Sequence, residues 1–219
     1  MSQVILRRFA ENDRERIREI ARNTGYKGEP TRAFFEDEEV IPRLFADYYI
    51  DYEPESCFVA EVDGKIVGYV LGCKDTKRYY RVLLWKLVPG LIVRILWKIA
   101  TLQYRRKTTY VTLWIAMRAW REMPRFSLVQ HPAHVHINVD ARYRGGSVGK
   151  KLARAMLTHL KDMEVKGVHG IVIESDEDGR MTRVAQDLYG FRLVTARELS
   201  GLEKLTHKKW YVKVVAKDL

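Results

Sequence analysis

One stretch, from His134 to Gly149, constrains the fold of this chain more than any other. It reads HVHINVDARYRGGSVG, and its first six residues alternate between polar and apolar side chains, which predicts a β-strand. The glycines that follow predict a tight turn, because glycine adopts backbone conformations closed to other residues. The sequence therefore predicts a strand, a glycine turn and a helix in succession. Apolar residues at helical spacing follow the turn, at Leu152, Met156, Leu157 and Leu160.

The predicted turn has the properties of an anion site. Glycines let backbone amides approach a ligand closely, and the free N–H groups at a helix N-terminus attract negative charge. Positive side chains surround the turn, at Arg142, Arg144, Lys150 and Lys151. We interpret the turn as a cradle for pyrophosphate. An ordinary connection between a strand and a helix is the alternative.

The net charge of the 219-residue chain, +11, comes from one segment. Residues 74–125 contain thirteen Lys or Arg and two acids, whereas the rest of the chain is balanced. Three interpretations fit an insertion of this kind: a helical lid or homodimer surface, a peripheral contact with an anionic membrane surface, or binding of nucleic acid. We rank nucleic acid last, because no recognised nucleic-acid motif is present. Four of the five tryptophans lie in this segment, at Trp85, Trp97, Trp114 and Trp120.

The chain has the sequence properties of a cytosolic protein. Its two cysteines, Cys57 and Cys73, lie in apolar runs without a pairing framework, so we expect buried, reduced thiols. The N-terminus shows no secretory signal, and no uncharged apolar run reaches the roughly 18 residues that span a bilayer. We therefore expect cytoplasmic localisation and no membrane crossing.

The remaining patterns predict one α/β domain with a mixed, mostly antiparallel sheet. Asp63-Gly64 is a strong hairpin signal, because apolar strand-like runs flank it. Two helical stretches are expected to contain a proline: residues 32–52 are expected to be interrupted at Pro42, and residues 81–103 to be broken or kinked near Pro89-Gly90. Another helix is expected over 108–121. Outside the insertion, strands are expected at Val4–Phe9, Ser56–Val62, Lys65–Cys73, His134–Val139, Gly170–Glu174, Phe191–Arg197 and Trp210–Ala216, with helices at 13–22, 150–165 and 180–189.

The hexapeptide RGGSVG, from Arg144 to Gly149, resembles motif A of the GNAT-type N-acetyltransferases, R/Q-x-x-G-x-G/A. Ser147 replaces the middle glycine, a departure that requires a negative φ at this residue. The element order also resembles the GNAT fold, and Gly190-Phe191 matches the Gly-Phe that opens its sixth strand. The stretches CFVAEVDGKIVGYVLGCKDT and HPAHVHINV more narrowly resemble the acetyltransferase-like domains of O-GlcNAc hydrolases and their free-standing bacterial relatives. The resemblance implies one GNAT domain over 1–219, with a basic, Trp-rich helical insertion at about 74–130 before the central strand.

The resemblance further implies acetyl-coenzyme A (acetyl-CoA) as cosubstrate, and no metal. In this family the amides of motif A hold the pyrophosphate, and the central strand offers its backbone to the pantetheine arm. A strand that splays from its neighbour near Val139 would place a backbone N–H close to the thioester carbonyl. The coenzyme-binding residues implied for this chain are Ile137, Asn138, Val139, Arg144, Gly145, Gly146, Ser147, Val148, Gly149 and Lys150.

Four residues are candidates for the acid–base chemistry of acetyl transfer. His134 and His136 share one strand face, and a neutral imidazole can take the proton of an amine directly or through water. Packing in a polar layer under the insertion is the alternative for both. Glu174, at the end of the next strand, is a weaker base candidate or a satisfied strand-end carboxylate. The family's usual general-acid tyrosine would fall earlier in its helix, where this chain has none, so Tyr189 is either a displaced acid or a core residue.

We therefore predict an acetyl-CoA-dependent N-acetyltransferase that moves an acetyl group directly to a primary amine. The segment Glu36–Glu55 carries eight acids against one Arg43, and as a wall of the acceptor cleft it would attract a cationic small molecule or peptide amine. A solvated acidic helix is the alternative. The competing function is a non-catalytic acyl-CoA-binding or interaction module, whose basic insertion contacts a membrane surface or an acidic partner. The missing acid tyrosine favours this competitor.

Overall fold

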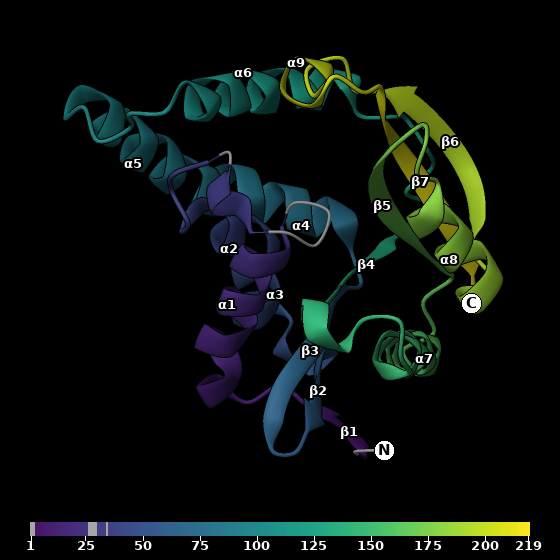
Figure 1. Ribbon diagram of the computed structural model, residues 1–219. Coiled ribbons are helices and arrows are strands. Elements are labelled where there is room, and N and C mark those ends of the chain that lie inside the picture. Colours follow the sequence, from purple (N-terminus) through teal and green to yellow (C-terminus); the bar gives the residue numbers. More distant parts are fainter. Residues whose placement is uncertain (1–2, 26–29, 34) are drawn as a thin grey trace.

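The computed structural model describes the backbone of residues 3–25, 30–33 and 35–219, with their side chains except those of residues 33, 119, 120, 204 and 205 (Figure 1). The described strands form one seven-stranded sheet in the order β1-β2-β3-β4-β5-β7-β6. All neighbouring strands are antiparallel except β4 and β5, so the predicted mixed and mostly antiparallel sheet is confirmed. The strands are β1 (Val4–Arg8), β2 (Cys57–Val62), β3 (Lys65–Cys73), β4 (Ala133–Val139), β5 (Gly167–Ser175), β6 (Arg192–Glu198) and β7 (Trp210–Asp218).

Helices cover both faces of the sheet (Figure 1). One face packs against α1 (Arg14–Thr24) and α3 (Asp47–Tyr52), and the other packs against α7 (Val148–Asp162). Strand alternation separates the two cores, because neighbouring residues on β2 belong to different ones. A second helix, α8 (Arg180–Tyr189), contacts α7 and the strands β5 and β6. The short α9 (Glu203–Thr206) precedes β7.

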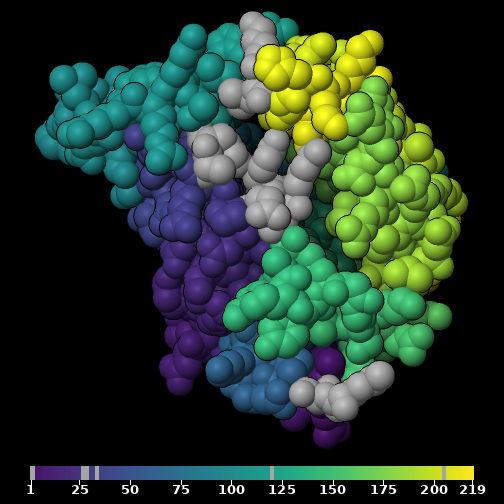
Figure 2. All heavy atoms as spheres, in the orientation of Figure 1, coloured from purple at the N-terminus to yellow at the C-terminus, as the bar shows by residue number. Residues whose placement is uncertain are grey.

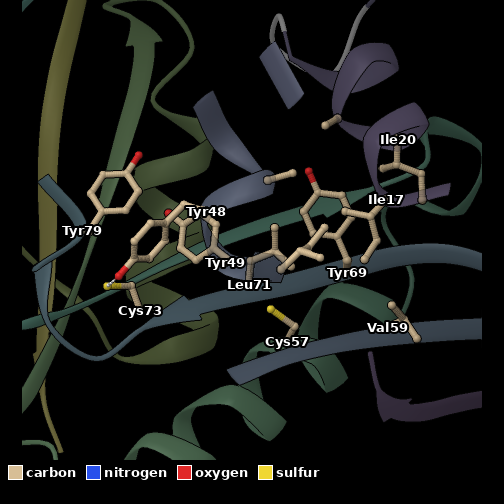
Figure 3. Close-up of a cluster of buried hydrophobic side chains, with 13 residues drawn as sticks. Ile17, Ile20, Tyr48, Tyr49, Cys57, Val59, Tyr69, Leu71, Cys73 and Tyr79 are labelled. Carbon is tan, nitrogen blue, oxygen red and sulfur yellow. Dashed lines mark hydrogen bonds between the residues drawn. The ribbon is translucent and has the colours of Figure 1, made fainter. Parts of the chain in front are cut away.

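The core between α1, α3 and the sheet is rich in tyrosine (Figure 3). Tyr48 and Tyr69 are fully buried, and the hydroxyl of Tyr48 donates to Glu53 at 2.7 Å. Cys57 and Cys73 lie in the same core as free thiols, which confirms that they are buried and unpaired. This core holds the first half of the sheet rigidly in place.

The helical stretch predicted over 32–52 is interrupted at a different residue from the expected one. Pro42 lies in the first turn of α2 (Val40–Phe45), where the proline N–H would have had no helical partner. The interruption falls instead at Ala46, whose φ of −130° separates α2 from α3. The prediction of a break at Pro42 was therefore wrong, because proline is well tolerated at the start of a helix.

Residues 74–130, the predicted insertion, are largely helical, and the break or kink expected near Pro89-Gly90 corresponds to a π-helical turn that ends at Leu87. α4 (Thr76–Val82), a π-helical turn (Leu83–Leu87) and α5 (Val88–Ala100) follow one another with helical backbone at each junction. A π-helical turn has i→i+5 hydrogen bonds, so it accommodates a proline that an uninterrupted α-helix would exclude. A third helix, α6 (Lys107–Glu122), then runs from α5 towards α9 (Figure 1). Among the described residues, no helix is both long enough and apolar enough to cross a bilayer.

Candidate active site

The central strand β4 is paired on one edge and open on the other. Residues 134–139 of β4 all pair with β3, whereas β4 pairs with β5 at Ala133 and His134 alone. The two parallel strands therefore separate after His134. Two side chains of β5 beyond this point, Ile171 and Ile173, are 41% and 48% exposed, so the separated strands are open to solvent.

The open edge of β4 presents unpaired backbone groups. The amide of Asp140 donates to the carbonyl of Val67 at 2.8 Å, on the β3 side. Because alternate residues of a strand point their N–H groups to opposite edges, the amides of Val135, Ile137 and Val139 point towards β5. Val135 still lies at the last pair with β5, whereas Ile137 and Val139 lie beyond it and face the opening. Buried or half-buried backbone amides normally find a partner, so this edge is suited to bind an extended ligand.

The glycine turn after β4 has the backbone geometry of an anion cradle. Gly145 has a φ of +79°, a conformation that favours glycine, and Ser147 has a φ of −79°, as the resemblance requires at this position. Helix α7 then starts at Val148 with no side-chain cap, which leaves its first-turn amides available. The guanidinium of Arg144 donates to the carbonyl of Val139 at 3.0 Å, and this bond holds positive charge where the turn meets the open edge.

His134 is fully engaged by its neighbours. The hydroxyl of Thr76 lies 2.7 Å from the carbonyl of Pro132 and 2.8 Å from His134 Nδ1. Its single proton goes to the carbonyl, so Nδ1–H donates to Thr76 and Nε2 accepts from the Tyr49 hydroxyl at 2.8 Å. Burial, followed by the neighbouring His169 and His136, holds the pKa of His134 well below its ordinary value. The residue is therefore neutral, with both ring nitrogens occupied.

His136 keeps one ring nitrogen unoccupied. Its Nε2 lies 3.1 Å from the side-chain amide of Asn138, which also lies 2.8 Å from the Tyr69 hydroxyl. The ring of Phe45 stacks on the imidazole with centroids 5.8 Å apart. Nδ1 has no hydrogen-bond partner among the described residues, and burial lowers the pKa of His136 to about 4. At neutral pH this imidazole is therefore uncharged and half-buried.

The carboxylate of Glu174 is saturated. It accepts from the backbone amides of Met181 and Thr182 at 3.0 and 3.4 Å, from the Thr182 hydroxyl, and from Lys213 at 2.8 Å. These bonds cap the N-terminus of α8, and the side chain is 2% exposed. Although burial raises the pKa of Glu174, the bonds from Lys213 and Thr182 hold it below its ordinary value. The geometry is that of a structural cap.

Tyr189 packs between α8 and the start of α7. It belongs to the edge of the second core, and a Cβ built on Gly149 would lie 3.4 Å from its hydroxyl oxygen. Burial raises the pKa of this hydroxyl, so it stays protonated at neutral pH. The phenol therefore faces the first turn of α7, beside the motif that the resemblance assigns to pyrophosphate.

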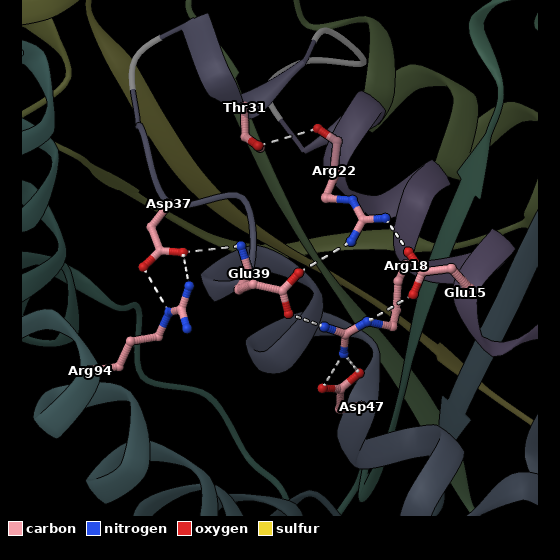
Figure 4. A network of polar contacts seen from close by, with 8 residues as sticks. All are labelled: Glu15, Arg18, Arg22, Thr31, Asp37, Glu39, Asp47 and Arg94. Atoms are coloured by element: carbon pink, nitrogen blue, oxygen red, sulfur yellow. Dashed lines mark hydrogen bonds and ion pairs between the residues drawn. The ribbon is translucent and has the colours of Figure 1, made fainter. Parts of the chain in front are cut away.

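Most acids of the acidic segment are paired with cations of the same chain. Arg18 pairs with Glu39 and Asp47, and Arg94 donates to Asp37 at 2.8 Å from the insertion (Figure 4). The expectation that this segment attracts a cation by its net charge is therefore not supported. Glu36 and Glu53 accept hydrogen bonds from uncharged donors, and Glu38 has no partner among the described residues. The other five acids each pair with a Lys or Arg: Asp37, Glu39, Asp47, Asp51 and Glu55.

Three residues that surround the histidines were not predicted from the sequence: Tyr49, Tyr69 and Thr76. They come from α3, β3 and α4, and distant segments meet here only because the sheet brings them together. Their sequence positions carry no local motif, although a polar atom opposite a buried histidine is expected on hydrogen-bonding grounds. No three His, Cys, Asp or Glu side chains converge on a metal geometry in the part of the chain that is described.

Comparisons with known proteins show the family and the fold of this chain. The model of the acetyltransferase (GNAT) family matches residues 15–191. The crystal structure of SsHAT superposes with a TM-score of 0.68 at 22% identity, over 99% of this chain and 98% of that one. A mutant agmatine N-acetyltransferase gives 0.52 at 19% identity over 99% of both chains. For yncA of Salmonella typhimurium, crystallised with acetyl-CoA, the score is 0.57 at 11% identity, over 99% and 94%. No curated protein matches the chain.

The chain belongs to the acetyltransferase (GNAT) family, and its sheet with flanking helices is the GNAT fold. It is accordingly an N-acetyltransferase that uses acetyl-CoA as cosubstrate. The open edge of β4 and the uncapped start of α7 fit this cosubstrate chemically, because they offer backbone donors to an extended amide-rich arm and to a diphosphate.

Proposed function

We propose that this enzyme transfers an acetyl group directly from acetyl-CoA to a primary amine, with His136 as the general base. The observation that carries the proposal is the contrast between the two histidines of β4. Both nitrogens of His134 are occupied, whereas Nδ1 of His136 has no partner among the described residues. His136 also lies on the stretch of β4 that has left β5.

The geometry of the described residues supports the following division of roles. Acetyl-CoA supplies the acetyl thioester. The backbone amides of Gly145–Lys150 and the side chain of Arg144 would bind the diphosphate of this cosubstrate. The backbone N–H groups of Ile137 and Val139, which face the opening between β4 and β5, are the donors proposed for the pantetheine arm and the thioester oxygen. His136 would then accept the amine proton at Nδ1, which is chemically possible because its imidazole is neutral above about pH 4.

The orientation of the Asn138 side-chain amide determines which ring nitrogen of His136 carries the proton. The Tyr69 hydroxyl and His136 Nε2 can each either donate or accept a hydrogen bond. The side-chain amide of Asn138 is therefore satisfied whether its nitrogen or its oxygen faces them. With the amide nitrogen facing them, the His136 proton sits on Nδ1. With the amide oxygen facing them, Nε2 carries the proton and Nδ1 is a free base. The proposed reaction requires the second orientation, and Asn138 is therefore a positioning residue.

Thiolate protonation needs no dedicated residue in this scheme. A free thiol has a pKa of about 8.5, so water is a sufficient proton donor. Glu174 is left out of the proton transfers because its oxygens are occupied, and Tyr189 is given a packing role beside the motif. Because five of the eight acids of this segment pair with cations of the chain, the cationic small-molecule or peptide amine predicted from it is one class of acceptor to be tested among several.

The test measures free thiol released from acetyl-CoA across a panel of charged and uncharged primary amines. His136→Ala should lower kcat by about 100-fold or more, the usual size of a general-base contribution, while calorimetry shows unchanged coenzyme affinity. Asn138→Asp should keep activity and move the acidic limb of the pH–rate profile above its expected position near pH 4, because a carboxylate accepts from Nε2 and raises the pKa of His136.

Two results would refute the assignment. Full activity of His136→Ala would remove the base, and loss of activity in Asn138→Asp with coenzyme binding intact would indicate that Nδ1 acts as a hydrogen-bond donor instead. Coenzyme binding without thiol release from any amine would favour the non-catalytic module. The narrower kinship with the domains of O-GlcNAc hydrolases, the single domain over 1–219 with its insertion at 74–130, and the cytoplasmic location stay predictions.

A further inference from the structure

The outward face of α5 is apolar, which is unusual for a helix at the surface. Ile92, Val93, Leu96 and Trp97 are 51%, 68%, 59% and 65% exposed. In the adjoining π-helical turn, Leu84 and Trp85 are 59% and 79% exposed. We call these six residues the outer face: Leu84, Trp85, Ile92, Val93, Leu96 and Trp97.

The two cations of α5 point inward, away from the outer face. Arg94 donates to Asp37 at 2.8 Å and Lys98 lies 3.1 Å from the same carboxylate, which is 1% exposed. Leu91 packs on that inner side among Phe35 and other apolar groups. An ordinary surface helix has the opposite arrangement, with its charges in water and its apolar stripe against the core. An exposed apolar area of this extent indicates a binding surface.

Unpaired positive charge flanks the outer face at both ends. Arg81 precedes it by one helical turn, and Arg105 and Lys107 follow it at the start of α6. These exposed side chains have no acidic partner among the described residues. The two acids of residues 74–125 are both occupied, Asp75 by capping α4 and Glu122 by Ser200 and Arg118. The surface is therefore apolar in the middle and cationic at its ends.

We propose that the outer face of α5 docks on an anionic lipid surface, with the helix lying in the plane of the headgroups. Tryptophan, leucine and isoleucine side chains insert into the boundary between headgroups and acyl chains, and flanking Lys and Arg pair with lipid phosphates. Thirteen residues of α5 at about 1.5 Å each give a contact about 20 Å long. Figure 2 shows this part of the chain standing out from the rest at one corner, where a flat surface can reach it.

The charge pattern argues against the other occupants. A second copy of the chain would bring together two segments that each carry thirteen cations and two acids, and these would repel. Nucleic acid binds through phosphate contacts and base stacking, but most of the outer face is aliphatic. An anionic lipid surface satisfies both the apolar centre and the cationic ends.

The test is flotation of the full chain with vesicles of phosphatidylcholine alone or with 30% phosphatidylglycerol. Val93 and Val129 form a matched pair, since both are valines, 68% and 71% exposed, and only Val93 lies on the outer face. Val93→Asp should weaken binding to anionic vesicles about tenfold or more, while Val129→Asp binds like the parent. Equal binding by all three proteins, or no binding to anionic vesicles at low salt, would overturn the proposal.

The charged ends are tested separately. Arg81→Gln combined with Arg105→Gln should weaken binding to anionic vesicles about 25-fold, or about fivefold for each cation, and Lys65→Gln in the distant β2–β3 hairpin should not. Two further results would overturn the proposal. One is a dimer in sedimentation velocity that Val93→Asp dissociates, and the other is tighter binding to duplex DNA than to anionic vesicles. Thiol release in solution should be unchanged in Val93→Asp, which separates this surface from the acetyl transfer.

Discussion

The two edges of β4 differ in almost every respect. On the β3 edge, six consecutive residues of β4 are in register, and the tyrosine-rich core supports the pairing from behind. On the β5 edge, pairing ends after two residues, and the exposed Ile171 and Ile173 of β5 follow. The same strand thus belongs to a rigid sheet on one side and to a binding surface on the other.

This difference shows how the fold produces a site. The paired edge fixes the positions of His136 and Asn138, because β3 holds the backbone from which they project. The open edge leaves the backbone donors of Ile137 and Val139 for a ligand. Helix α6 spans the separated halves (Figure 1): Leu113 packs near Leu91, and its last turn reaches Ser200 through Glu122. Helix α6 therefore connects the two parts of the protein that lie on either side of the opening.

Mild acid should lower the free energy of unfolding, because two histidines are buried where β4 and β5 separate: His136 and His169. Burial lowers the pKa of both His136 and His169 to about 4, against an ordinary 6.5. The unfolded chain then binds more protons than the folded chain between these values, so stability falls as the pH drops from 6.5 to 4. Each histidine accounts for about 3 kcal/mol, a large part of the stability of a typical domain. Urea unfolding at pH 7 and pH 4.5 measures the loss.

A matched variant identifies the source of this loss. His136→Gln removes one of the shifted histidine titrations, leaving those of His134 and His169, and should reduce the slope of stability against pH by about one proton over the same window. The buried carboxylate of Asp37 acts mainly below this window, because its pKa is about 2 and most of its contribution is lost below pH 4. An unchanged slope in His136→Gln would show that this imidazole is hydrated and ordinary.

Glu174 tests whether the far end of β5 is structural. Glu174→Gln removes the charge that pairs with Lys213 and caps α8, and should cost about 2 kcal/mol, which lowers the melting temperature by about 6 °C. Thiol release at 20 °C should stay within about threefold of the parent. The reverse result, a loss of kcat above 100-fold with an unchanged melting temperature, would make Glu174 the base and displace His136.

The sequence predicted the paired edge and the turn better than the open edge. The alternation of β4, the Asp63-Gly64 hairpin and the helical spacing of α7 are local patterns, and each element was found close to its predicted bounds. The negative φ of Ser147 also followed from the motif alone. The separation of β4 from β5 and the partners of His134 depend on where distant segments meet, which local patterns do not encode.

Two errors have the same physical origin. Pro42 was expected to break its helix, but it lies in the first turn of α2 and interrupts no required hydrogen bond. Near Pro89 the expected break or kink coincides with the π-helical turn that ends at Leu87. The acidic segment was treated as free charge, but Arg18 and Arg94 come from other parts of the chain and pair with acids of this segment. In both cases the local sequence does not reveal the hydrogen bonds and ion pairs that determine the structure.

The glycine turn offers a matched pair of variants at the end of the open edge. Gly145→Ala places a side chain at a φ of +79°, which costs about 1–2 kcal/mol and should shift the amides that follow. Coenzyme affinity in calorimetry should fall about tenfold. Gly146→Ala is the control, because its φ is not positive and the nearest atom to its Cβ would be the Tyr143 carbonyl at 3.8 Å. Equal affinities for both variants would mean that the turn does not hold the diphosphate.

The smallest effect is expected at Tyr189, and it decides whether the open edge contains a general acid. Tyr189→Phe keeps the ring that packs against α7 and removes only the hydroxyl that faces Gly149. If water protonates the leaving thiolate, kcat should change by less than about threefold, with the basic limb of the pH–rate profile in place. A loss of 100-fold together with the disappearance of that limb would instead make the phenol the acid, because burial raises its pKa and keeps its proton available at neutral pH.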